Sequence, residues 1–158
     1  MSQTQDGPSP NVGGFEEARH ELIVEHYRKT RNRHFLTDPD IQTTEVNPFC
    51  GDEITIQVRI NQDVLEEVGT HAVGCSICQA SLSMLSEAIK NLTLSGAARL
   101  SSIFQRMMLG EKINSEENLF LGELTDLVVV RKYPIRVKCA LLAWVALDFG
   151  LRDYQTNR

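Results

Sequence analysis

The chain has 158 residues, of which 42% are hydrophobic and 23% are charged, and its formal net charge is −5. This length and composition are those of one soluble globular domain with enough apolar side chains for a core. The acidic balance argues against a protein that binds nucleic acid mainly through charge, because such a protein needs a basic surplus. No apolar run approaches the roughly 20 residues of a membrane-spanning helix. We therefore expect no nucleic acid and no membrane among the partners.

The N-terminal residues carry no targeting pattern. Residues 1–14 contain three glycines and two prolines, and we expect them to form a disordered tail. They lack the basic-then-apolar order of a signal peptide and the arginine-rich pattern of a transit peptide. The expected location is the cytoplasm, where thiols stay reduced. A single domain is expected over residues 15–152, followed by a C-terminal tail at 153–158.

The first elements in chain order are one helix and three strands. Apolar residues recur at helical spacing from Phe15, and the basic stretch Arg28–Arg33 suits the C-terminal end of that helix. Three strand patterns follow, of which the second alternates strictly between apolar and polar residues. They cover residues 41–46, 54–60 and 65–73. Because short turns join them, we expect antiparallel pairing.

The pattern returns to helical spacing after Gly74. Ser76 and Gln79 have the spacing of a capping box, which predicts a helix that starts just after Cys75. Further helices are expected at about 95–109, 115–127 and 134–149, the last with proline in its first turn and Gly150 past its end. The sequence thus predicts an α+β domain with a three-stranded antiparallel sheet packed against about five helices.

The four cysteines are the residues with the most chemical information. In a reducing compartment they indicate metal binding or redox chemistry rather than structural disulfides. Cys50 lies in a turn between two strands, and Asp52 follows two residues later, on the same side of an extended chain. The alternative is that the Asn-Pro and Gly-Asp pairs of this segment serve only as turn formers.

Two other cysteines are expected at helix starts. Cys75 lies at a strand-to-helix junction, where free N–H groups and the helix dipole stabilise a thiolate. Cys139 lies near the start of the last helix and follows two cations, Arg136 and Lys138. Either thiol can instead be an inert core residue. Together with Cys50 and Asp52, these two cysteines would complete a tetrahedral zinc site of three sulfurs and one oxygen. The net charge of that site would be −2, which the two cations can offset.

Cys75 and Cys78 form a separate Cys-x-x-Cys motif. Such a motif is typical of a zinc half-site or of a redox pair. The chain has no second Cys-x-x-Cys and no thioredoxin-like alternation of strands and helices around this one. Because Cys78 falls in the first turn of the expected helix, we interpret it as a core residue.

Three segments in this order resemble the U-type iron–sulfur cluster assembly family, which includes IscU, SufU and the N-terminal domain of NifU. The segments are Asn47-Pro48-Phe49-Cys50-Gly51-Asp52, Gly74-Cys75-Ser76-Ile77 with Ala80-Ser81, and Arg136-Val137-Lys138-Cys139-Ala140. The resemblance runs from about Phe15 to Gly150 and also implies that family's α+β fold. Lys138 stands where the IscU branch has a histidine. This lysine, and the long segment between the second and third cysteines of the motif, resemble the SufU branch.

The resemblance implies a zinc ion held by Cys50, Asp52, Cys75 and Cys139. It also implies a role as acceptor of persulfide sulfur from a SufS-type cysteine desulfurase, with downstream iron–sulfur assembly proteins as further partners. Cys50 would accept the sulfur and Arg136 would stabilise negative charge. One departure from the pattern is Cys78, where the family leads us to expect a small residue such as serine.

Two other functions remain open at this stage. The same four ligands can assemble a [2Fe–2S] cluster, which would make the protein a scaffold. Alternatively, zinc can serve only to stabilise the fold. As an enzyme, the protein would be at most a sulfurtransferase that acts together with the desulfurase.

Overall fold

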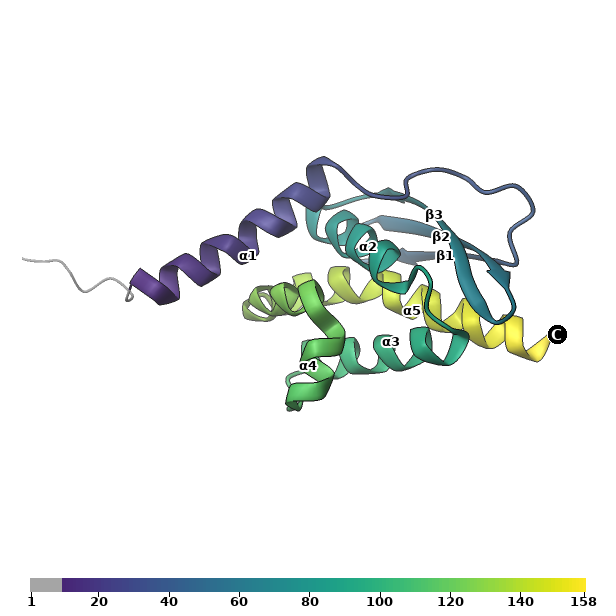
Figure 1. The fold of residues 1–158 in the computed structure, drawn as a ribbon. Coiled ribbons are helices and arrows are strands. Elements are labelled where there is room, and N and C mark those ends of the chain that lie inside the picture. Colours follow the sequence, from purple (N-terminus) through teal and green to yellow (C-terminus); the bar gives the residue numbers. More distant parts are fainter. Residues whose placement is uncertain (1–9) are drawn as a thin grey trace, which may run out of the picture.

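Over residues 10–158 the structure consists of a three-stranded sheet, five α-helices and one 3₁₀ helix (Figure 1). The computed structural model describes the backbone of residues 10–158 and the side chains from residue 17 onward. In chain order the elements are α1 (Pro10–Arg28), β1 (Ile41–Asn47), β2 (Asp52–Asn61), β3 (Val64–Val73), α2 (Ser76–Ile89), α3 (Leu94–Met108), α4 (Ser115–Leu121), the 3₁₀ helix η1 (Gly122–Lys132) and α5 (Pro134–Thr156). This architecture confirms the predicted fold class.

The sheet is an antiparallel meander in the order β1-β2-β3, as the sequence predicts. Asn47 pairs with Asp52 where β1 turns into β2, and Glu53 pairs with Val73 where β3 ends. The start of β2 and the end of β3 therefore lie at the same end of the sheet. This register brings the β1–β2 turn next to the junction between β3 and α2.

One face of the sheet is covered by α2 and α5 (Figure 1). Helix α2 packs against β3, whereas α5 crosses β1 and β2. Ile54, Ile56 and Val58 of β2 are fully buried, which explains their strict alternation with more polar residues. Helix α3 packs on α5, where the rings of Phe104 and Trp144 stack with centroids 4.4 Å apart. Among the described residues, no helix combines the length and the hydropathy that a membrane crossing requires.

Helices extend into both segments that we expected to form tails. Helix α1 begins at Pro10, within the segment expected as a tail, and residues 1–9 lie outside the described part. Proline suits the first position of a helix, because the N–H that it lacks would have no partner there. At the other end, α5 continues to Thr156, into the segment expected as a tail. The division into one domain and two tails stays a prediction.

Two predicted helix ends are wrong because glycine has two different roles here. The helix expected at 115–127 stops at Leu121, and Gly122, with φ +54°, turns the chain into η1. By contrast, Gly150 lies inside α5 rather than past its end. A Cβ atom at Gly150 would lie 2.6 Å from Ile41 Cγ2 and 2.7 Å from Thr43 Oγ1. Gly150 therefore permits α5 to cross β1 at close range, a tertiary reason that local spacing does not contain.

Candidate metal centre

The turn between β1 and β2 presents Cys50 to solvent and Asp52 to the interior. Asn47 shapes this turn: its carbonyl accepts the N–H of Gly51 at 2.8 Å, and its side-chain Oδ1 accepts the N–H of Phe49 at 3.0 Å. Gly51 has φ +73°, a conformation that favours glycine. As a result Cys50 is exposed at the tip, while Asp52, the first residue of β2, is 1% exposed.

Asp52 is bound to the junction between β3 and α2. The backbone N–H of Cys75 donates to Asp52 Oδ1 at 2.8 Å, and the Cys75 thiol lies 3.4 Å from Asp52 Oδ2. Gly74 permits this approach, because a Cβ atom there would lie 2.2 Å from Asp52 Oδ1. Gly74 also has φ +145°, which a residue with a side chain rarely adopts.

Helix α2 is capped differently from the expectation. The predicted capping residue, Ser76, is instead the first residue of the helix, and Cys75 is the N-cap. The Cys75 Sγ atom accepts the N–H of Cys78 at 3.4 Å, while Gln79 Nε2 donates to the carbonyl of Gly74 at 2.9 Å. The prediction was wrong because sulfur took the acceptor role that hydroxyl oxygen usually has at this position.

Cys139 lies in the second turn of α5 and is buried. The position of this turn is set by the buried Ser81 of α2, whose hydroxyl donates to the carbonyl of Ala140 at 2.7 Å. Ser81 Oγ also accepts the Nε1–H of Trp144 at 3.2 Å. These two hydrogen bonds fix the start of α5 against α2, and thereby fix Cys139 relative to Cys75. No local sequence pattern indicates that Ser81 or Trp144 supports the site.

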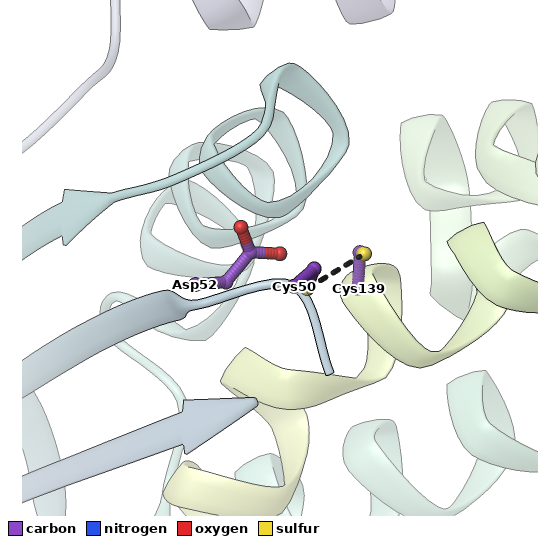
Figure 2. Close-up of side chains that lie close together, drawn as sticks. All are labelled: Cys50, Asp52 and Cys139. Atoms are coloured by element: carbon purple, nitrogen blue, oxygen red, sulfur yellow. Dashed lines mark hydrogen bonds between the residues drawn. The ribbon is translucent and has the colours of Figure 1, made fainter. Parts of the chain in front are cut away.

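The thiols of Cys50 and Cys139 face each other 3.7 Å apart, and Asp52 completes a group whose ligand atoms all lie within 4.8 Å of one another (Figure 2). Cys75 contacts this group through Asp52. In a tetrahedral zinc site, two sulfur ligands are about 3.8 Å apart, and a sulfur and an oxygen about 3.6 Å apart. The separations of 3.7 Å between the Cys50 and Cys139 sulfurs and 3.4 Å between Cys75 Sγ and Asp52 Oδ2 fit this geometry, and Cys75 lies outside the group of mutually close ligand atoms. The donor set of three sulfurs and one carboxylate suits a zinc ion.

The electrostatics of the group also favour a cation. Burial alone would raise the pKa of Asp52, but hydrogen bonds from the Cys75 N–H and from the surrounding thiols outweigh it and hold the pKa below its usual value. Burial raises the pKa of the Cys139 thiol, and the contacts with Asp52, Cys75 and Cys50 raise it further. An ionised carboxylate thus faces crowded thiols, which a divalent cation would allow to lose their protons together.

Two cations on α5 border the thiols. Arg136 is exposed, and its pKa is raised, first by its hydrogen bond with Cys139 and then by the charge of Cys75. The Lys138 Nζ atom lies 5.0 Å from the ring centroid of Phe49, which is 82% exposed on the turn that carries Cys50. This cation–π contact joins the turn to α5, and the sequence analysis did not anticipate it.

Cys78 belongs to the hydrophobic core rather than to the thiol group. It is 1% exposed, and burial raises the pKa of its thiol. A buried thiol that holds its proton is a poor metal ligand, because ligation requires the thiolate. This placement agrees with its interpretation as a core residue.

Comparisons with known proteins agree with this fold. Residues 18–158 match the family model described as the NifU-like N-terminal domain. The chain is 37% identical over 131 residues to the zinc-dependent sulfurtransferase SufU of Bacillus subtilis, covering 83% of this chain and 87% of that protein. It is 34% identical over 130 residues to the iron–sulfur cluster assembly scaffold protein IscU of Streptococcus pyogenes, covering 82% and 80%.

A solved structure shows the same fold. The putative iron–sulfur cluster assembly scaffold protein of the SUF system from Fervidobacterium islandicum superposes with a TM-score of 0.78 at 29% identity, covering 83% of this chain and 94% of that chain. The family model and the relatives together cover most of the sequence. We conclude that the chain belongs to the NifU-like N-terminal domain family of iron–sulfur cluster assembly proteins, as the sequence motifs led us to expect.

Proposed function

We propose that the protein accepts persulfide sulfur on Cys50 from a SufS-type cysteine desulfurase and passes it to iron–sulfur assembly proteins in the cytoplasm. The observation that carries this proposal is the contrast between an exposed Cys50 and two less accessible thiols beside it. A sulfur acceptor must be reached by the sulfur atom of another protein, and only an accessible thiol meets that requirement. The similarity to the zinc-dependent sulfurtransferase SufU supports the same function.

We further propose that Cys50, Asp52, Cys75 and Cys139 hold one zinc ion. When bound, zinc would keep the thiols deprotonated and protect them from oxidation. Cys50 is the ligand best placed to leave the site, because the turn around it is open: a Cβ atom at Gly51 would have no neighbour within 4 Å. The other three residues begin or lie within strands and helices, or cap one of them.

The transfer itself needs only residues of the two proteins. The Cys50 thiolate attacks the outer sulfur of the desulfurase persulfide, the bond between the two persulfide sulfurs breaks, and the desulfurase cysteine leaves as a thiolate. Arg136 would stabilise the negative charge that the new persulfide brings to this end of α5. The activity would then be that of a sulfurtransferase that acts together with the desulfurase.

The surface around Cys50 supports a protein partner. Phe49 and Ile135 are 82% and 71% exposed, and Tyr133 and Val73 are also exposed. These apolar side chains stand next to the turn, the start of α5 and the junction before α2. A docked partner would cover them and exclude water from the persulfide during transfer.

The first test is to determine which metal the protein carries. Zinc, iron and acid-labile sulfide are measured on protein purified without oxygen. We expect about one zinc per chain and no sulfide, because one tetrahedral site holds one ion. Iron with an equal amount of sulfide would instead favour the scaffold that assembles a [2Fe–2S] cluster on the same residues.

The second test is a mutation at the proposed acceptor. With cysteine and the desulfurase, the wild-type chain should gain the mass of one sulfur atom, whereas Cys50→Ala should gain none. Glu53→Gln is the matched control, because Glu53 is exposed one residue beyond Asp52. Sulfur acceptance by Cys50→Ala at the wild-type level would disprove the assignment of Cys50.

A further inference from the structure

Cys78 of the Cys75-x-x-Cys78 motif has no role in the proposed function. Cys75 and Cys78 occupy the N-cap and the first turn of α2, and the Cys75 sulfur accepts the N–H of Cys78 at 3.4 Å. The Cys75 side chain is therefore folded over the turn that carries Cys78. Because the Cys75 sulfur contacts the backbone N–H of Cys78, the two cysteines are neighbours at the start of α2.

The two thiols differ sharply in access. Cys75 is partly exposed and contacts Asp52 in the thiol group, whereas Cys78 is 1% exposed and packs in the core. A reagent from outside therefore meets Cys75 before Cys78. Pairs with one outer attacking thiol and one inner resolving thiol can form an internal disulfide.

Sulfur that arrives as a persulfide needs two electrons before it can enter a cluster as sulfide. The outer sulfur of a persulfide is formally at the level of elemental sulfur, and an iron–sulfur cluster contains sulfide. A pair of thiols that becomes a disulfide supplies two electrons. The chain thus carries a two-electron donor directly beside the residue that we propose to receive the sulfur.

We infer that Cys75 and Cys78 act as a reducing dithiol that releases sulfide from sulfur delivered to Cys50, an inference that rests on the proposed function. In the first step the Cys75 thiolate leaves the metal and attacks the outer sulfur of the Cys50 persulfide, and Cys50 leaves as a thiolate. Cys50 and Cys75 both lie against Asp52, so this step spans only the width of the thiol group.

In the second step the Cys78 thiol passes its proton to the outer sulfur of the Cys75 persulfide, and the Cys78 sulfur attacks the inner sulfur as a thiolate. A disulfide forms between Cys75 and Cys78, the bond to the outer sulfur breaks, and the proton of the Cys78 thiol leaves with that sulfur as hydrogen sulfide. The outer sulfur gains two electrons, and the two cysteine sulfurs each lose one. An external dithiol then reduces the disulfide and restores both cysteines.

The test loads the full-length, metal-bound chain with inorganic polysulfide, removes the excess, and adds no reductant. The wild-type chain should gain one sulfur atom, release it as sulfide, and end with two hydrogens fewer and a Cys75–Cys78 disulfide in its peptide map. Cys78→Ser and Cys78→Ala should keep the added sulfur and release roughly tenfold less sulfide, because the internal source of electrons is missing. Adding dithiothreitol should release the retained sulfur from both variants.

Sulfide release by the Cys78 variants at the wild-type rate would overturn the inference, as would a wild-type disulfide between Cys50 and Cys139. The wild-type peptide map distinguishes these outcomes even where both substitutions prevent folding. Loading by polysulfide also separates this inference from the proposed function. If the desulfurase fails to load Cys50, the proposed function fails; if loaded sulfur leaves without Cys78, only the dithiol fails.

Discussion

The Cys50 turn and the helix starts that carry Cys75 and Cys139 hold their thiols in different ways. The turn is held mainly by its own backbone and by Asn47, and Cys50 stands exposed at its tip. Cys75 caps a helix and is tied to Asp52, whereas Cys139 is fixed by the buried Ser81 between α2 and α5. The Cys50 turn can therefore move without disturbing the core, whereas the backbone positions of Cys75 and Cys139 are set by contacts with Asp52 and Ser81.

The two regions therefore contribute differently to the site. The helix starts keep a fixed template of two thiols and one carboxylate, because moving them would break buried hydrogen bonds. The turn can bring its thiol to the template or to a partner at small energetic cost. A site for transient cargo needs both properties, since a fully fixed site releases slowly and a fully mobile one binds weakly.

Gly74→Ala should have the largest effect on the fixed region. Its Cβ atom would meet the Asp52 carboxylate at 2.2 Å and the Asp52 Cα atom at 2.9 Å, so backbone as well as side chain must shift. We expect roughly tenfold or greater loss of zinc affinity, as for other residues that orient a metal ligand, measured by competition with a chelator.

Gly51→Ala is the matched control for this prediction. Gly51 also has a positive φ, +73°, but no atom lies within 4 Å of its Cβ position. The substitution should cost only the backbone strain, about 1–2 kcal/mol of unfolding free energy, and leave Asp52 in place. Equal losses of zinc affinity in the two variants would show that the turn and the junction are equally constrained, which contradicts the comparison.

Ser81→Ala tests the support beneath Cys139. It removes the hydrogen bond to the carbonyl of Ala140 and leaves the buried Trp144 Nε1–H without its acceptor. We expect a loss of about 1–3 kcal/mol of unfolding free energy, the typical cost of an unsatisfied buried donor. Zinc affinity should fall as well, because the start of α5 is no longer fixed against α2. Thermal unfolding and chelator competition measure the two effects.

Ser83→Ala separates general stability from support of the site. Ser83 is buried on the same helix, but its hydroxyl contacts His26 of α1 and the N–H of Arg31, both at 2.8 Å, rather than α5. This variant should lose stability without losing zinc affinity. If both serine variants lowered zinc affinity equally, Ser81 would have no specific role in placing Cys139.

The sequence predicted the elements well and the contacts between them poorly. The strict alternation of Ile54, Ile56 and Val58 identified β2, because one face of a half-buried strand must be apolar. By contrast, the Ser81 contact with Ala140 joins residues 59 positions apart, and no local pattern contains it. Gly150 shows the same limit: local rules place glycine after a helix, whereas here it lies within one at a close crossing.

The candidate site could be predicted from the sequence because its residues lie near the ends of helices and strands. Cys50 and Asp52 lie in a turn, and Cys75 lies at a strand-to-helix junction, both of which local patterns locate. That these positions meet Cys139 was a hypothesis from the chemistry of residues at element ends, which the family resemblance supported and which no local spacing contains. The structure brings Cys50, Asp52 and Cys139 together and places Cys75 against Asp52, and zinc binding by these four residues stays a prediction. The sulfur cap of α2 was missed because capping rules are written for oxygen.

Phe49→Leu should have the smallest effect and addresses the cation–π contact between the exposed turn and α5. Losing the 5.0 Å contact between Lys138 and the Phe49 ring removes about 0.5–1 kcal/mol. The zinc-loaded variant should therefore release metal to a chelator about two- to fivefold faster, with the unfolding temperature unchanged. Phe49→Tyr keeps the ring and should behave like the wild type.

Lys138→Gln should speed release in the wild-type background but not in Phe49→Leu, because the contact is already lost there. Additive effects of the two substitutions would show that Phe49 and Lys138 act independently, and that the cation–π contact does not hold the turn against α5.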